Sequence, residues 1–132
     1  MVYFEKGSIQ DSFLAEDLKN GLFEALEKIG TKNKVLAVPP DFTRFPSRAG
    51  ELTEFAWEYY GEKLTDILPA LGTHSPMTDS QIAHMFGKTP RNLFRDHDWR
   101  NDVVTLGTVP AEFVKEVSEG AVDYPWPVQV NK

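Results

Sequence analysis

The chain has 132 residues, of which 41% are hydrophobic and 26% charged, a composition typical of one globular domain. Its net charge of −6 and the absence of a Lys/Arg cluster exclude a protein built to bind nucleic-acid phosphates. It contains no cysteine, which excludes disulfides, thiolate metal sites and cysteine nucleophiles, and it shows no signal peptide or membrane span. We therefore expect a single domain, residues 1–132, in a cytoplasmic protein without nucleic-acid or membrane partners.

The first half of the chain alternates strand-like and helix-like segments. A short edge strand is predicted at 2–5. Apolar residues at helical spacing predict a helix over 14–30, ending at a glycine. A buried strand at 35–38 is followed by an amphipathic helix at about 49–61 and a second buried strand at 64–72. This order predicts a βαβ unit.

The second half of the chain begins with the capping-box pattern T-x-x-Q, which predicts a short helix over 79–86. A third strand is expected at 103–107, whereas the pattern of PAEFVKEVSEG fits a helix or an extended segment equally well. The two prolines in 122–130 restrict that segment to an edge or bulged strand. The whole pattern predicts an α/β fold: a mostly parallel sheet with flanking helices. Because the chain stops within a strand-like pattern, we expect a partial, truncated N-terminal domain of a longer protein.

Two proline-stiffened loops follow the first two buried strands. A βαβ crossover makes its strands parallel, so both loops leave the same edge of the sheet, where ligands bind in open α/β folds. The first loop carries Asp41, Thr43 and Arg44, and the second carries Thr73 and His74. Prolines in both loops reduce the entropy lost when a ligand orders them. The sequence therefore predicts a candidate site at this edge, helped by free N–H groups at the start of the following helix.

The residue types of the two loops suit a small, oxygen-rich anion. Arg44 offers a planar fork to a carboxylate or phosphate, His74 can carry a proton near neutral pH, and Asp41 could orient a hydroxyl or a ribose. The alternative is purely structural: Asp41 caps a turn, Arg44 pairs with a neighbouring acid, and His74 is a hydrogen-bonded loop histidine. His84 is expected to be solvated. His97, between two acids, belongs to a polar loop network or a metal site, and the network is the better interpretation.

Four stretches in order resemble the N-terminal part of the lactate racemase family. They are DFTRFPS at 41–47, ALGTHSPMT at 70–78, DHDWRND at 96–102 and LGTVPAEF at 106–113. A D-x-T-R loop, a G-T-H-x-P loop and an H-D pair occur in that family in this order and at similar spacing. The resemblance covers most of the chain from about residue 34 onward.

This resemblance implies an isomerase that racemises or epimerises a 2-hydroxy acid by hydride transfer to a nickel-pincer nucleotide. It implies that His74 is one of two acid/base histidines, that Asp41, Phe42, Thr43 and Arg44 contact the cofactor, and that Arg44 also binds the substrate. No residue of this chain is implied as a metal ligand. Phe42 and Ser75 depart from residues that are common in the family, so the substrate need not be lactate.

The resemblance also implies that the site is incomplete, because the second acid/base histidine, the lysine that tethers the cofactor and the nickel-binding histidine of the family would lie beyond Lys132. We therefore expect the isolated chain to be inactive and not to retain the cofactor, with homo-oligomer formation through an exposed sheet edge as a candidate interaction. One alternative is a non-catalytic module that binds a nucleotide or a carboxylate. Another is a hydrolase using Asp41 and His74, although the chain has no nucleophile elbow. A reading frame that continues past Lys132 would favour the racemase, and a stop codon would favour the module.

Overall fold

The computed structural model describes residues 1–69 and 72–131. The chain divides into two compact units, Met1–Asp96 and His97–Lys132. The first unit contains α1 (Ala15–Ile29), β1 (Val35–Ala37), η1 (Phe42–Ser47), α2 (Ala49–Tyr60), η2 (Gly61–Lys63), β2 (Leu64–Ile67), α3 (Asp79–Phe86) and η3 (Arg91–Leu93). The second contains β3 (Val103–Val109), α4 (Ala111–Val117) and β4 (Trp126–Asn131). The chain is therefore a mixed α/β protein.

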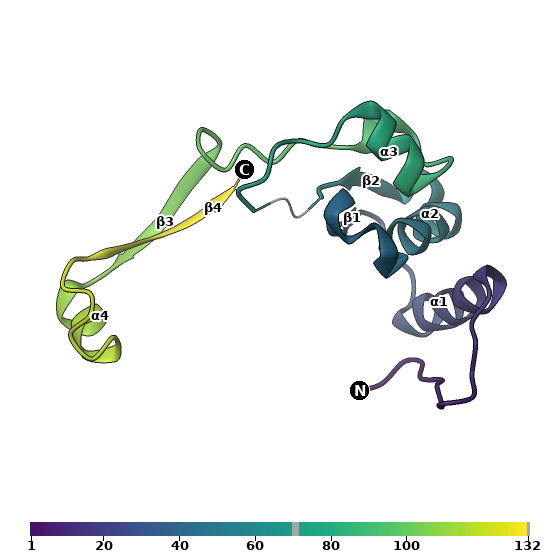
Figure 1. Cartoon of the computed structure of the whole chain (residues 1–132), viewed down its shortest axis with the longest axis horizontal. Coiled ribbons are helices and arrows are strands. Elements are labelled where there is room, and N and C mark those ends of the chain that lie inside the picture. Colours follow the sequence, from purple (N-terminus) through teal and green to yellow (C-terminus); the bar gives the residue numbers. More distant parts are fainter. Residues whose placement is uncertain (70–71, 132) are drawn as a thin grey trace. The chain divides into compact units, whose positions relative to one another are not determined.

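The centre of the first unit is a βαβ crossover, as the sequence predicts. β1 and β2 pair in parallel, with Val35 opposite Leu64 and Ala37 opposite Ile67, and α2 connects them (Figure 1). β2 is shorter than predicted, since it ends at Ile67, and residues 70–71 of the predicted strand lie outside the described residues. The parallel pairing places the ends of both strands at one edge of the sheet.

A third segment extends this sheet beyond β2. Phe94 forms an isolated parallel bridge with Ile67, and the backbone N–H of Arg95 donates to the Ile67 carbonyl at 2.9 Å. The Arg95 guanidinium also donates to Asp66 at 2.8 Å. The segment around Phe94 thus continues the parallel pairing for one residue.

The hydrophobic core of the first unit lies between this sheet and the helices α2 and α3. Leu64, Ile67 and Phe86 are fully buried, and the Phe86 and Phe94 rings have centroids 4.8 Å apart. The other buried members of the cluster come from α3 and the segment before it: Met77, Ile82 and Met85. α3 begins and ends where its capping box predicts, and it closes the core at the edge where the loops emerge.

α1 packs against α2. The Phe23 and Tyr59 rings meet edge to face at 5.1 Å, and Lys19 pairs with Glu58 at 2.7 Å. The predicted edge strand at 2–5 is wrong, because this segment has no strand partner and forms an irregular arm along α1. The arm docks where α1 has no side chain: a β-carbon at Gly21 would lie 2.7 Å from the Phe4 ring.

The second unit is a two-stranded antiparallel sheet, with α4 in the connection between its strands (Figure 1). The ambiguous stretch after β3 is therefore helical, and the proline-containing segment is an edge strand. The register irregularity lies on the partner strand β3, between Thr105 and Gly107. Alternation places apolar residues on one face of the sheet, and Thr105 and Gln129, which hydrogen-bond at 3.2 Å, on the other. The strands thus form one parallel and one antiparallel pair, so the described residues do not contain one mostly parallel sheet.

Within the described ranges, no helix has the length and apolar character needed to cross a membrane.

Candidate functional site

Asp41 is the first residue of the candidate site, four positions after Ala37, the last residue of β1. It is the N-cap of η1, and its Oδ1 accepts hydrogen bonds from the Thr43 backbone N–H at 3.0 Å and from the Thr43 hydroxyl at 2.5 Å. Only 7% of the residue is exposed. The structural alternative for Asp41, that it caps a turn, is therefore correct, but this role uses only one of its two oxygens.

The second carboxylate oxygen of Asp41 binds His74 from the other loop. Asp41 Oδ2 and His74 Nδ1 are 2.6 Å apart, and the histidine side chain remains 55% exposed. The two residues follow different strands, and the parallel pairing of β1 and β2 brings their loops to the same edge. The structure thus joins the predicted carboxylate and the predicted proton carrier in one dyad.

The negative charge of Asp41 determines which nitrogen of the neutral His74 ring carries the hydrogen. Burial raises the pKa of Asp41, but hydrogen bonds from the Thr43 hydroxyl, the His74 ring and the Thr43 backbone outweigh burial, so the pKa lies below its ordinary value. An ionised carboxylate can only accept, so Nδ1 of His74 must carry the shared proton. The neutral ring then has its lone pair on Nε2, the arrangement expected of a general base.

Arg44 reaches the dyad through Thr43. Its Nη1 donates to the Thr43 hydroxyl oxygen at 3.3 Å, and that hydroxyl donates to Asp41. Four side chains therefore form a chain of hydrogen bonds from the guanidinium to the imidazole. Arg44 does not line the pocket described below, and its backbone (φ −110°, ψ 24°) is non-helical inside η1.

An open pocket of about 470 Å³ lies over the dyad. Of the predicted site residues, Asp41, Phe42, Thr43 and His74 line it. The lining is completed by Thr73, Ser75, Met77 and Gln81. The last two were not predicted as site residues, although the position of Gln81 within the capping box of α3 could have indicated that it lies at the loop edge.

The capping box of α3 uses two of the backbone N–H groups at the start of this helix. The Thr78 backbone N–H donates to the Gln81 side chain at 2.9 Å, and the Gln81 backbone N–H donates to the Thr78 hydroxyl at 3.3 Å. These two N–H groups are therefore not free to bind an anion. The capping box satisfies these two groups internally, and the expected contribution of the other N–H groups at the start of α3 to anion binding stays a prediction.

His84 has a role that the sequence analysis missed. It is exposed, as expected, but its ring centroid lies 4.8 Å from that of Phe45 and 5.9 Å from that of Phe42. The two phenylalanine rings are themselves 5.6 Å apart. The three rings form a closed cluster between α3 and η1, which helical periodicity alone could not reveal.

The residues that the structure describes contain no group of three or more His, Asp or Glu side chains able to hold a metal ion. Near His97, Asp98 accepts hydrogen bonds from the backbone N–H groups of Arg100 and Asn101 and from the Asn101 side chain at 2.8 Å. These hydrogen bonds form a polar network next to His97, and the interpretation that His97 itself belongs to such a network stays a prediction. Asn101 and Arg100 also lower the pKa of Asp98 by stabilising its ionised form.

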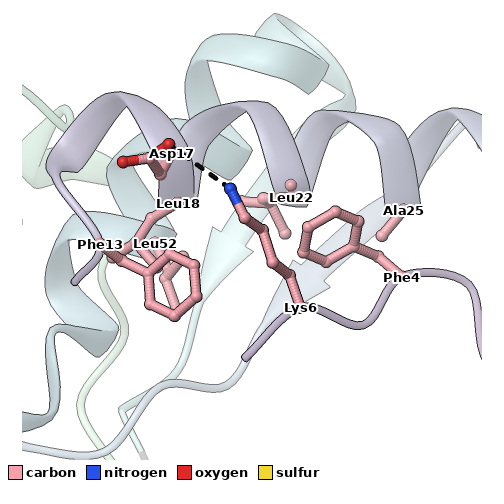
Figure 2. Close-up of a pocket in the computed structure, with 9 residues that line it drawn as sticks. Phe4, Lys6, Phe13, Asp17, Leu18, Leu22, Ala25 and Leu52 are labelled. Carbon is pink, nitrogen blue, oxygen red and sulfur yellow. Dashed lines mark ion pairs between the residues drawn. The ribbon is translucent and has the colours of Figure 1, made fainter. Parts of the chain in front are cut away.

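A separate pocket of about 280 Å³ lies between the N-terminal arm and α1 (Figure 2). Its walls are mainly apolar, with Phe4 and Phe13 of the arm facing Leu18 and Leu22 of α1. Its two charged groups, Lys6 and Asp17, form an exposed ion pair with a separation of 4.0 Å. This pocket has no proton carrier, so the pocket over the dyad is the better candidate site.

Comparison with known proteins yields one informative likeness. No family model matches the chain, and no curated protein matches it significantly. The chain is similar to a protein from Thermotoga maritima of known crystal structure, with 30% sequence identity and a TM-score of 0.73. The alignment covers 89% of this chain but only 30% of the Thermotoga chain. The chain therefore spans about a third of the length of that protein.

Proposed function

We propose that this chain is the N-terminal part of a lactate-racemase-like enzyme that racemises or epimerises a 2-hydroxy acid. The observation that carries the proposal is the Asp41–His74 dyad, with a separation of 2.6 Å, at the edge of the sheet where the D-x-T-R and G-T-H-x-P motifs meet. The likeness to a Thermotoga chain about three times as long supports a site completed by further polypeptide. In that longer, cytoplasmic enzyme the βαβ unit would begin a mostly parallel sheet.

His74 would act as one of the two acid/base groups. Its Nε2 takes the proton of the substrate hydroxyl, and Nδ1 keeps its hydrogen bond to Asp41, whose negative charge stabilises the imidazolium that forms. When the original configuration at carbon is restored, the same nitrogen returns the proton, whereas the second acid/base group would supply it when the configuration is inverted. Arg44, fixed by Thr43, offers its free N–H groups to the substrate carboxylate.

The implied cofactor, a nickel-pincer nucleotide, fits these residues in part. Thr43 and Phe42 give the pocket a polar and an aromatic wall suited to a pyridinium nucleotide. Nothing in 1–69 or 72–131 forms a metal-binding group, so the nickel would need ligands from elsewhere. When bound, the cofactor would accept the carbon-bound hydrogen as hydride. The isolated chain therefore binds substrate weakly, loses the cofactor and does not turn over.

Binding of small acids tests this proposal. We expect lactate, at millimolar concentrations, to shift the NMR signals of His74, Thr43 and Arg44 in the 132-residue chain. Propionate, which lacks the hydroxyl group, should shift the Arg44 signal but not the His74 ring. The variant His74→Ala should bind lactate no better than propionate. If no acid perturbs these residues, the proposal is wrong.

The same titration separates the racemase from the alternative, a non-catalytic module that binds a nucleotide or a carboxylate. Equal shifts with lactate and propionate, or tight binding of nicotinate mononucleotide with no response to lactate, would favour the module. In a longer enzyme that contains this part, His74→Ala should abolish racemisation while the cofactor stays bound. Racemisation by the isolated chain supplied with cofactor would show that the site is complete.

Homo-oligomers that form through an exposed sheet edge remain part of the proposal. Light scattering of the 132-residue chain measures whether they form.

A further inference from the structure

The dyad joins two loops that belong to different elements, so its geometry depends on how those elements are held together. Asp41 is the N-cap of η1, and His74 lies in the loop that leads into α3. The 2.6 Å contact between them requires η1 and the start of α3 to keep a fixed separation. The contacts between η1 and α3 therefore control the distance between the Asp41 carboxylate and the His74 ring.

The direct tie between η1 and α3 is the ring cluster of Phe42, Phe45 and His84. Its ring centroids lie 4.8, 5.6 and 5.9 Å apart, within the range of favourable aromatic contacts. Between the described residues of η1 and those of α3 there is no hydrogen bond or ion pair, so ring packing makes the connection. Phe42 also packs against the hydrophobic core, whereas Phe45 is 41% exposed.

We propose that His84 is a positioning residue for the dyad: its ring holds Phe42 and Phe45 against α3 and so keeps the Asp41 carboxylate on Nδ1 of His74. Phe42 directly follows Asp41 in the chain, so a displaced Phe42 ring moves the carboxylate with it. This inference rests on the proposed function, because it concerns the same His74. The contact is of ring on ring, so an apolar ring can replace the imidazole.

The test reads the tautomer of His74 by ¹⁵N NMR of the 132-residue chain at neutral pH. The wild type should show the Nδ1–H form, and His84→Ala should lose this preference while the backbone spectrum stays folded. His84→Phe should restore it, because the ring is restored. Ser80→Ala, an exposed change on the same helix, should have no effect, and Asp41→Asn serves as the positive control for loss.

An unchanged His74 tautomer in folded His84→Ala overturns the inference, as does a failure of His84→Phe to restore the Nδ1–H form. If His84→Ala does not fold, Phe45→Leu makes the same comparison, since it keeps apolar bulk but removes a ring from the cluster. The readout needs neither substrate nor cofactor. A wild-type chain without the Nδ1–H form of His74 would refute the dyad, and with it the proposed function. An Nδ1–H form of His74 in the wild type and in every variant of the ring cluster would refute only the role of His84.

Discussion

Asp41 combines a structural and a chemical task by dividing its two oxygens between them. One oxygen holds the turn of η1 through Thr43, and the other holds the ring of His74. A buried carboxylate is costly unless its oxygens are hydrogen-bonded, and here both are. The turn therefore orients the carboxylate before any ligand arrives, which limits the free energy that ligand binding must spend on ordering the loop.

Asp41→Asn should make the stability of the chain less dependent on pH in the acid range. The pKa of Asp41 in the folded chain lies below its ordinary value of about 3.8. The contribution of the ionised carboxylate to the free energy of unfolding is therefore complete above about pH 3.8, and it is lost as the pH falls through the lower folded pKa. We expect the variant to be less stable at pH 7, by on the order of 1.5–3 kcal/mol, the range for hydrogen bonds to charged groups.

Urea unfolding of both proteins at pH 7, 4 and 3 measures this difference, which should shrink toward pH 3. Asp11→Asn, at an exposed aspartate of the N-terminal arm, is the matched control and should track the wild type at every pH. If the difference in unfolding free energy between the wild type and Asp41→Asn stayed constant from pH 7 to pH 3, the lowered pKa of Asp41 would be contradicted.

The packing of α2 against α3 depends on Gly50. A β-carbon at this position would lie 2.0 Å from the Met85 carbonyl oxygen and 2.6 Å from the Met85 side chain. The obstacle is backbone, so it cannot be relieved by turning a side chain. The absence of a side chain at Gly50 thus sets how closely α3, and the loop before it, approaches the βαβ unit.

Gly50→Ala should therefore destabilise the chain although alanine is the better helix former. The gain in helix propensity is about 1 kcal/mol, whereas overpacking costs about 1–3 kcal/mol and more where backbone must move. We expect a net loss of at least about 1 kcal/mol in denaturant unfolding. Gly7→Ala, where a new β-carbon meets nothing within 4 Å, should change stability by less than about 0.5 kcal/mol. A Gly50→Ala variant as stable as the wild type would show that α3 can move at no cost.

The elements that the sequence predicts best are those set by local chemistry. The capping box fixes α3 at Asp79–Phe86, and Gly30, with φ +82°, ends α1. Parallel pairing of β1 with β2 follows from the crossover, and it places Asp41 and His74 together. The single domain predicted for residues 1–132 stays a prediction beside the two compact units of the structure.

The features that the sequence could not predict depend on contacts distant in the chain. The bridge of Phe94 to Ile67 and the cluster of His84 with two phenylalanines have no periodic signature. β3 was expected in the parallel sheet, but the chain reverses after α4, where Glu119 and Gly120 have positive φ, and returns as β4. The arm at 2–5 alternates like a strand but lies against a helix, where no strand partner is available.

The two units differ in how much apolar surface they bury, and this difference should appear in their stability. The seven buried members of the hydrophobic core all belong to Met1–Asp96. Among the described residues of the second unit, Val114 is the one buried hydrophobic side chain, at 9% exposure. An isolated pair of antiparallel strands is marginally stable in water.

Amide hydrogen exchange of the whole chain measures this contrast. We expect the amides of β2 and α3 to exchange at least about tenfold more slowly than those of β3 and β4, equivalent to about 1.4 kcal/mol. The internal control is α4, which caps the same unit and should exchange as rapidly as the strands. If the amides of both units exchanged equally slowly, and dilution of the protein did not change this, the second unit would have to be stabilised by contacts other than those within the unit.

The Asp41–His74 hydrogen bond closes a loop between residues 33 positions apart in the chain, and it can form only after β1, α2 and β2 have come together. Contacts of such sequence separation are entropically late and slow to form during folding. We therefore expect the NMR signal of the His74 imidazole to change during refolding at the time when the βαβ crossover is complete. We expect the Asp41–His74 pair and the βαβ crossover to form in the same phase of refolding.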